Sequence, residues 1–280
     1  MNYLVTGANG FIGTYCRHNL NVNGVNFIYA NCSNLNQTTN FEREYKNISE
    51  VLRNTRVDGI IHLASVIPQH FNEAGYKSVF IPNIEMMNNL YEFALERKIK
   101  SFTYISTFGS MKSSEKLDIK DYYTLSKITG ELFCNMMAET GIAATCLRIP
   151  SPYGEYLQQE IFTKKALNND DILIFGSGER EQNFIYVGDI MNAIKLTIEN
   201  CVSGIYEIVA KKNTSTLQLA QEIISICSSE SNIVITNQPD PQESFKPNYS
   251  YQAARKDLGF EQKFELRDGL TRFIQWYKMQ

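Results

Sequence analysis

The sequence contains few of the residues that build metal sites or disulfide frameworks. It has three histidines and six cysteines, and no two cysteines lie at the CxxC spacing of zinc and redox sites. No cysteine has a histidine near it in a metal-ligand pattern. We therefore expect no metal site, and we expect the thiols to be reduced and mostly buried.

Long apolar runs and an excess of basic residues are also missing. No segment approaches the length of a membrane helix, which needs about 18 consecutive apolar residues. No basic stretch precedes an apolar run at the N-terminus, and lysines and arginines are scattered in a chain of formal net charge −3. These absences predict a cytoplasmic protein with no signal peptide, membrane span or nucleic-acid partner.

Apolar runs of strand length alternate with helical patterns over the first part of the chain. The expected strands are 2–6, 25–30, 58–63, 101–106 and 142–149. Helical patterns follow the first strand, cover 78–98 and cover 121–139. Several strand runs are apolar throughout, which is typical of a parallel sheet covered by helices on both faces. The predicted fold class is α/β, with a Rossmann-like doubly wound parallel sheet.

The alternation weakens after Pro150, where two prolines and a glycine follow one another closely. We therefore expect an NAD(P)-binding Rossmann domain over 1–150 and a smaller mixed α/β substrate-binding region over 151–280. Open α/β sheets bind ligands beyond the carboxyl ends of their strands. The smaller region is accordingly expected at that edge of the sheet.

Three glycines lie between the first strand and the first helix. Gly7, Gly10 and Gly13 form a GxxGxxG pattern, in which glycine permits a tight turn and close approach of a pyrophosphate. The free N–H groups at the start of the following helix attract phosphate oxygens. A tight turn without a ligand is the alternative, but the loop's position relative to the later motifs favours a dinucleotide.

The second strand does not end in the acidic residue that binds the hydroxyls of an NAD ribose. Asn31, Cys32 and Ser33 stand there instead. These residues do not repel a 2′-phosphate, although no arginine or lysine adjoins them. The cofactor is therefore predicted to be NADP or NAD, with NADP favoured.

Tyr123 and Lys127 form a YxxxK pattern on the helix expected over 121–139, and their i, i+4 spacing places both on one helical face. A phenol has a pKa of about 10, and a nearby ammonium favours the phenolate. The fourth strand precedes this helix, and Thr107 follows Ser106 at the end of that strand. A hydroxyl at this position can bind a reacting oxygen. The alternative is a surface tyrosine beside a solvated lysine.

Together these motifs resemble the extended short-chain dehydrogenase/reductase family, in its nucleotide-sugar epimerase/dehydratase group. The resemblance is carried by TGANGFIG (6–13), DGIIHLAS (58–65), YISTFGS (104–110), YTLSK (123–127) and LRIPSPYGE (147–155). It selects Thr107 over Ser106 as the catalytic hydroxyl, beside Tyr123 and Lys127. It also implies a homodimer formed through helices that include the Tyr-Lys helix.

The resemblance implies two sets of contacts. The expected cofactor-binding residues are Gly7, Asn9, Gly10, Phe11, Ile12, Asn31, Cys32, Ser33, Asn47, Ile48, Leu63, Ala64, Ser65, Asn83, Ile105, Tyr123, Lys127, Pro150 and Pro152. The expected substrate-binding residues are Thr107, Phe108, Ser151, Arg180, Gln182 and Lys246.

Some positions depart from the family pattern. Ser151 stands where many relatives have an asparagine that touches the nucleotide-sugar. Gln182 stands where many have an arginine on the diphosphate, although Arg180 lies two residues away. Phe108 and Gly109 replace the Asp-Glu pair that follows the catalytic threonine in dehydratases, which argues against dehydration.

Three functions remain open. The first is reduction of a nucleotide-linked 4-keto sugar, which the tolerance for NADPH favours. The second is a nucleotide-sugar 4-epimerase that uses the same residues with tightly bound NAD. The third is a catalytically silent cofactor-sensing protein, against which the complete set of Thr107, Tyr123 and Lys127 argues.

Overall fold

The computed structural model describes residues 1–30, 52, 54–68, 75–109, 119–157 and 161–280. Five of the expected cofactor-binding residues lie outside the described residues: Asn31, Cys32, Ser33, Asn47 and Ile48. The cofactor preference predicted from the end of the second strand therefore stays a prediction.

The described residues contain a central sheet of six strands in the spatial order β10-β5-β4-β3-β1-β2. The strands are β1 (Asn2–Thr6), β2 (Asn26–Ala30), β3 (Gly59–His62), β4 (Ser101–Thr107), β5 (Ala143–Ile149) and β10 (Gly204–Glu207). Every neighbouring pair is parallel. Because β2 and β3 lie on opposite sides of β1, the order reverses beside β1, where a doubly wound sheet binds its ligand. The predicted fold class is confirmed.

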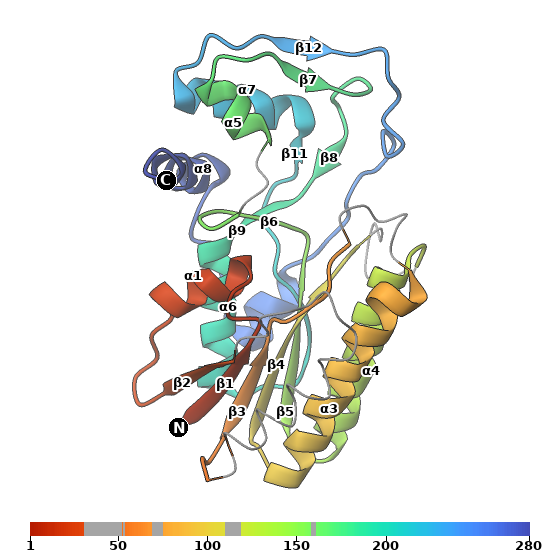
Figure 1. Cartoon of the computed structure of the whole chain (residues 1–280), viewed down its shortest axis with the longest axis vertical. Coiled ribbons are helices and arrows are strands. Elements are labelled where there is room, and N and C mark those ends of the chain that lie inside the picture. The colour runs from red at the N-terminus through yellow and green to blue at the C-terminus, as the bar shows by residue number, and fades with distance from the viewer. Residues whose placement is uncertain (31–51, 53, 69–74, 110–118, 158–160) are drawn as a thin grey trace.

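Helices cover both faces of this sheet (Figure 1). The helices α1 (Phe11–Asn19) and α6 (Val187–Asn200) lie on one face, and α3 (Ile81–Arg97) and α4 (Tyr122–Glu139) lie on the other. Each face of the sheet has its own hydrophobic core, and successive strand side chains alternate between the two. Ile61 packs in the core under α1 and α6, whereas Ile60 packs in the core under α3 and α4. Burial on both faces explains why the strand runs are apolar throughout.

Helix ends follow local rules that the sequence contains. Asp121 is the N-cap of α4, and its carboxylate accepts a hydrogen bond from the Thr124 N–H at 2.7 Å. Pro82 lies in the first turn of α3, where its missing N–H costs nothing. A π-helical turn at Tyr76–Phe80 precedes α3, so the α-helix begins at Ile81, later than the pattern over 78–98 predicts.

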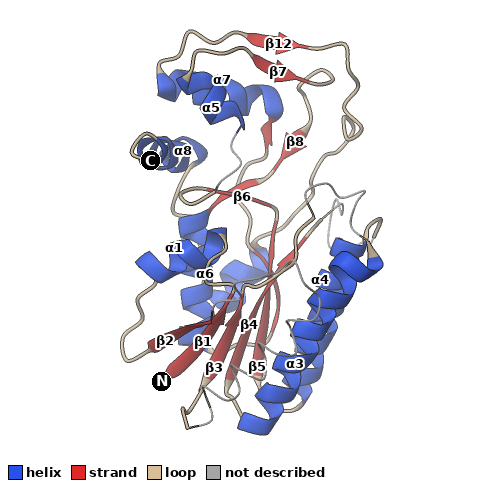
Figure 2. Cartoon of the chain, viewed as in Figure 1, coloured by secondary structure: helices blue, strands red, loops and turns tan. Residues whose placement is uncertain are grey.

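Beyond residue 150 the chain builds a second layer above the carboxyl edge of the sheet (Figure 2). Among the described residues, this layer contains three helices and three two-stranded sheets. The helices are α5 (Ile161–Leu167), α7 (Thr216–Cys227) and α8 (Leu266–Tyr277). The sheets pair β6 (Ser151–Tyr153) with β9 (Phe184–Tyr186), β7 (Ile172–Ile174) with β12 (Ile233–Ile235), and β8 (Glu181–Gln182) with β11 (Thr214–Ser215). Later in the chain, a π-helical turn at Ala254–Leu258 packs Ala254 and Leu258 into the core between the central sheet and the helices α1 and α6.

The second part of the chain also contributes to the central sheet. Strand β10 pairs with β5, and α6 packs on the face that α1 covers. The division into 1–150 and 151–280 therefore stays a prediction, and the Rossmann sheet takes its sixth strand from beyond that boundary. In the described part of the chain, no helix is both long and apolar enough to cross a membrane.

Candidate active site

The turn after β1 is built for close backbone approach. Gly7 has φ 73°, and a Cβ there would lie 2.5 Å from the Ala64 nitrogen on the neighbouring β3 exit. A Cβ on Gly13 would collide with the carbonyl oxygen of Gly7. Both glycines therefore allow the turn, α1 and the loop after β3 to pack without side chains between them.

The N-terminus of α1 is open to an anion. Gly10 is the N-cap, and no side chain caps the helix there. The first N–H groups of a helix have no intrahelical acceptor, and Phe11 and Ile12 supply such groups here. A pocket of about 630 Å³ opens at this point, lined by Asn9, Gly10, Phe11, Thr14, Tyr156, Leu157, Trp276 and Gln280. The glycine cradle and the uncapped helix fit a dinucleotide pyrophosphate.

The loop after β3 is held in place by Asn83 of α3. The Asn83 side chain accepts a hydrogen bond from the Val66 N–H at 2.7 Å and donates to the Val66 carbonyl at 3.1 Å. It also donates to the Ser126 hydroxyl of α4 at 3.0 Å. Buried Asn83 thus fixes the segment that carries Ala64 and Ser65, and its own contact with a cofactor stays a prediction.

Tyr123 and Lys127 are both buried on α4, with 8% and 3% of their surfaces exposed. The Lys127 Nζ lies 6.0 Å from the centre of the Tyr123 ring. Burial raises the pKa of Tyr123 to about 12, against a smaller opposing effect of its hydrogen bond with Ser65. Burial also lowers the pKa of Lys127 to about 7, and the carboxylate of Glu131 opposes this shift.

The direction of the Tyr123 shift is opposite to the sequence-based expectation. We expected the neighbouring ammonium to favour the phenolate, but the desolvation of a buried phenol outweighs any such effect. Tyr123 therefore carries its proton at neutral pH in this structure, as a general acid requires.

The two hydroxyls at the end of β4 have different surroundings. The buried Ser106 hydroxyl donates to Glu131 Oε1 at 2.6 Å, and Glu131 binds Arg148 of β5 through both oxygens, at 2.7 and 2.6 Å. The half-buried Thr107 hydroxyl accepts a hydrogen bond from the Gly109 N–H at 3.0 Å. Ser106 therefore belongs to a buried ion-pair network, and Thr107 is the hydroxyl outside it.

His62 is the last residue of β3, where it is paired with Thr6 of β1 on one side and Tyr104 of β4 on the other. It is buried, its Nδ1 lies 2.8 Å from the Thr6 hydroxyl, and its ring stacks on Tyr104 with 5.6 Å between centroids. Burial, aided by the positive charge of Lys127, lowers the pKa of His62 to about 3. The imidazole is therefore neutral.

Several other expected residues lie in packed positions. Ile105 belongs to the sheet core. Phe108 is 1% exposed and stacks on Tyr249 at 3.8 Å between centroids. Pro150 and Pro152 are half-buried where β5 leads into β6.

Some of the expected substrate-binding residues form bonds within the protein. Arg180 forms an ion pair with Asp240 at 3.0 Å and donates to Gln242 at 3.0 Å. Gln182 lies in β8 opposite Thr214. Lys246 is exposed and follows Asp240 and Gln242 in the chain. Ser151 bonds through its backbone N–H to Asn183.

Sequence reasoning missed four residues beside these positions: Tyr104, Glu131, Arg148 and Tyr249. Glu131 follows Lys127 by four residues, so the helical period alone places it on the same face. No local signal identifies Arg148 or Tyr249, because their partners lie far away in the sequence.

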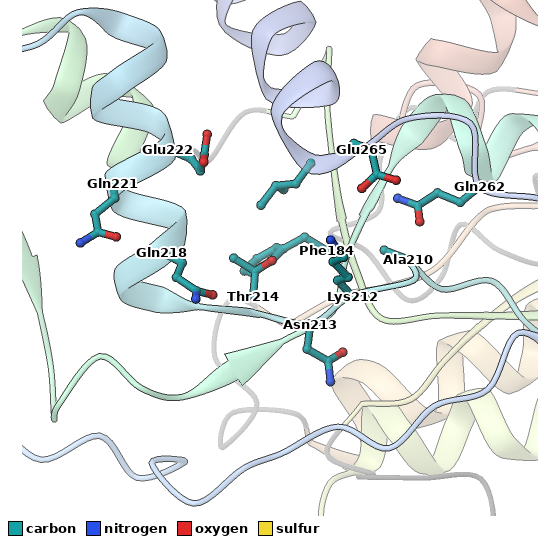
Figure 3. Close-up of a pocket in the computed structure, with 11 residues that line it drawn as sticks. Phe184, Ala210, Lys212, Asn213, Thr214, Gln218, Gln221, Glu222, Gln262 and Glu265 are labelled. Carbon is teal, nitrogen blue, oxygen red and sulfur yellow. The ribbon is translucent and has the colours of Figure 1, made fainter.

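A separate pocket of about 370 Å³ lies beside the N-terminal ends of α7 and α8 (Figure 3). Several of its polar side chains already have partners: Gln218 completes the cap of α7, Gln262 accepts from the Lys211 N–H, and Glu222 pairs with Arg267. It contains none of the residues of the glycine turn or the Tyr-Lys helix.

Comparison with known proteins gives concordant results. The profile of the NAD dependent epimerase/dehydratase family matches residues 3–209. A putative UDP-glucose 4-epimerase of Methanocaldococcus jannaschii is 25% identical over 306 residues, which cover 98% of each chain.

Solved structures share the fold. The UDP-glucose 4-epimerase of Thermotoga maritima with UDP-glucose has a TM-score of 0.83 at 24% identity, covering 100% of this chain and 99% of its own. The dTDP-glucose 4,6-dehydratase of Streptomyces venezuelae with NAD bound has a TM-score of 0.80 at 19% identity, covering 100% and 97%.

Proposed function

The chain belongs to the NAD dependent epimerase/dehydratase family, and on that premise we propose that it is a nucleotide-sugar 4-epimerase that acts through NAD. The observation that carries the proposal is the pairing of buried Tyr123 and Lys127 on α4 with an uncapped glycine turn at the switch point of the sheet. Its full-length relative named as a putative UDP-glucose 4-epimerase favours epimerisation.

The residues fit a nicotinamide dinucleotide. The glycine cradle and the N–H groups of Phe11 and Ile12 would hold the pyrophosphate. Lys127 has no hydrogen-bond acceptor among the described residues, so its three N–H donors are available to the nicotinamide ribose. When bound, the cofactor accepts a hydride from a sugar carbon and can return it.

The protein's own groups handle the proton. Tyr123 exchanges a proton with the sugar oxygen as that oxygen changes between alcohol and ketone, and Thr107 hydrogen-bonds the same oxygen. Removal of the sugar's proton requires the Tyr123 phenolate, which burial disfavours, and a positive charge on Lys127 acts against this effect of burial. Epimerisation needs this exchange in both directions, because the sugar is first oxidised and then reduced from the other face.

Elimination has less support in this chain. The two residues after Thr107 are Phe108 and Gly109, and neither carries an acid or a base. The Phe108 ring is buried against Tyr249. We therefore favour reactions at one sugar carbon over dehydration.

A 4-keto sugar reductase is the second candidate. The observation that favours it is the absence of an acidic residue at Asn31, Cys32 and Ser33, which tolerates the 2′-phosphate of NADPH. A reductase consumes its cofactor one for one with product, whereas an epimerase regenerates it.

The test starts with the cofactor that the purified protein retains, released by acid and identified by chromatography. The protein is then incubated with UDP- and dTDP-linked hexoses, and the products are followed by NMR with no added cofactor. Conversion of one 4-epimer into the other, with NAD released on denaturation, supports the epimerase. Turnover only with stoichiometric NADPH and a keto sugar replaces it by the reductase, and retention of NAD without any turnover supports the silent alternative.

A further inference from the structure

Lys127 is 3% exposed, and its ammonium has no direct ion pair among the described residues. The carboxylate nearest in sequence on the same helical face is Glu131, but its oxygens are bonded to Arg148 and Ser106. The closest aromatic contact of Lys127 Nζ is the Tyr104 ring, whose centre lies 4.8 Å away. A cation over the face of a buried ring is stabilised by the ring's quadrupole.

The Tyr104 ring is itself held from two sides. The neutral His62 ring stacks on it at an interplanar angle of 22°, and His62 is tied to the Thr6 hydroxyl at the end of β1. Gly130, one turn after Lys127 on α4, provides the space for this ring. A Cβ on Gly130 would collide with the ring and hydroxyl of Tyr104.

Other ionisable groups also face this ammonium. Glu131 on α4 raises its pKa, and the thiols of Cys146 on β5 and Cys134 on α4 act in the same direction. His62 on β3 is neutral, and the pKa of Tyr104 lies well above 10 because the phenol is buried. The Tyr104 ring is therefore an uncharged π-system at every pH at which the enzyme would work.

We propose that Tyr104 is a positioning residue whose ring keeps Lys127 charged and directed at the cofactor site, with Gly130 and His62 fixing that ring. The cofactor role of Lys127 rests on the proposed function, whereas the effect of Tyr104 on the charge of Lys127 does not. The proposal predicts that the lysine loses its proton at lower pH when the aromatic face is removed.

The direct test follows Lys127 by NMR against pH, in protein isotopically labelled at the lysine Cε and assigned with a Lys127→Met variant. Tyr104→Phe keeps the aromatic face and should leave the titration midpoint nearly unchanged. Tyr104→Leu should lower it by about one pH unit, because a desolvated cation–π contact contributes on that scale. The matched control is Tyr206→Leu, which replaces a buried tyrosine of β10 whose hydroxyl donates to the carbonyl of Ser203, just before that strand.

Fluorinated phenylalanines at position 104 provide a second series, which remains informative where Tyr104→Leu does not fold. Added fluorines weaken the negative face of the ring with little change in its size, so each should lower the midpoint further. The proposal is overturned by a midpoint that ignores fluorination, or by equal midpoints in Tyr104→Leu and Tyr104→Phe.

Titration with NADH, followed by fluorescence across the same pH range, separates this inference from the proposed function. Binding to the native protein should weaken as pH rises through the Lys127 midpoint, and in Tyr104→Leu this loss should begin about one unit lower. No NADH binding by the native protein at any pH sinks the proposed function and leaves the NMR result standing. Binding that is equally pH-dependent in all variants sinks the inference alone.

Discussion

The phenol and ammonium of the Tyr-Lys pair are both displaced toward their neutral forms by burial. Burial therefore disfavours transfer of the Tyr123 proton to Lys127, because it raises the pKa of the phenol and lowers the pKa of the ammonium. The proposed roles of the two residues are separable. Tyr123 transfers the proton, whereas Lys127 binds the nicotinamide ribose and lowers the pKa of the phenol.

Replacing Tyr123 with Phe should therefore lower turnover by about 100-fold or more, since general acid–base catalysis contributes on that scale. Cofactor affinity should change little, because the phenol hydroxyl is not among the pyrophosphate contacts. Steady-state kinetics and NADH titration of the same preparation check both statements. Turnover at the native rate in Tyr123→Phe would remove the residue from the mechanism.

A second residue-scale prediction concerns the buried pair of Glu131 and Arg148, whose side chains are 3% and 8% exposed. Glu131→Ala removes the carboxylate that binds the buried Arg148 guanidinium through both of its oxygens, so we expect a loss of about 3–5 kcal/mol in the free energy of unfolding by urea denaturation. The control is Glu199→Ala in the half-exposed Lys195–Glu199 pair, which should cost less than about 1 kcal/mol. Similar losses in both variants would contradict the argument.

At the scale of elements, the glycine turn offers a matched pair of substitutions. Gly7 and Gly24 both have φ 73°, but only at Gly7 would a Cβ meet the backbone of a neighbouring loop. Gly24→Ala should cost about 1–2 kcal/mol of stability, from the left-handed backbone alone. Gly7→Ala should cost more and should also abolish NADH binding, because the Ala64 segment must move. Equal losses of stability in the two variants, with NADH binding intact, would show that the glycine turn does not form part of a dinucleotide site.

Element patterns in the sequence were informative where contacts are local. The apolar runs predicted β1 to β5, and Asp121 predicted the start of α4. No sequence pattern predicts the sixth strand, because GIYE at Gly204–Glu207 is short and is held in the sheet by pairing with β5. A strand of that length is specified by its neighbours rather than by its own period.

The candidate site shows the same division. Glycines and the YxxxK spacing are readable because a turn and a helix face are local properties. The ion pair of Arg180 with Asp240 joins residues sixty positions apart, so its effect on a diphosphate contact is invisible in the sequence. Burial of Tyr123 likewise depends on the packing of α4 against the loop after β3, and this reversed the expected direction of its pKa.

At the scale of the whole molecule, α3 and α4 lie side by side on the outer face of the sheet (Figure 1), and each carries exposed apolar side chains. Leu132 and Met136, one helical turn apart on α4, are 57% and 49% exposed, and Leu95 on α3 is 36% exposed. We propose that this surface forms a homodimer, because covering these exposed apolar side chains with a second copy of the chain removes them from water and stabilises the pair.

Replacing Leu132 and Met136 together with Glu should then convert a dimer into a monomer, because like charges would face each other across a two-fold contact. Size-exclusion chromatography with light scattering measures the mass directly. Leu173→Glu is the control: this leucine of β7 is 48% exposed but lies in the second layer, away from both helices, so its dimer should persist. A native protein that is monomeric at micromolar concentration, or a double variant that remains dimeric, would place the contact elsewhere or remove it.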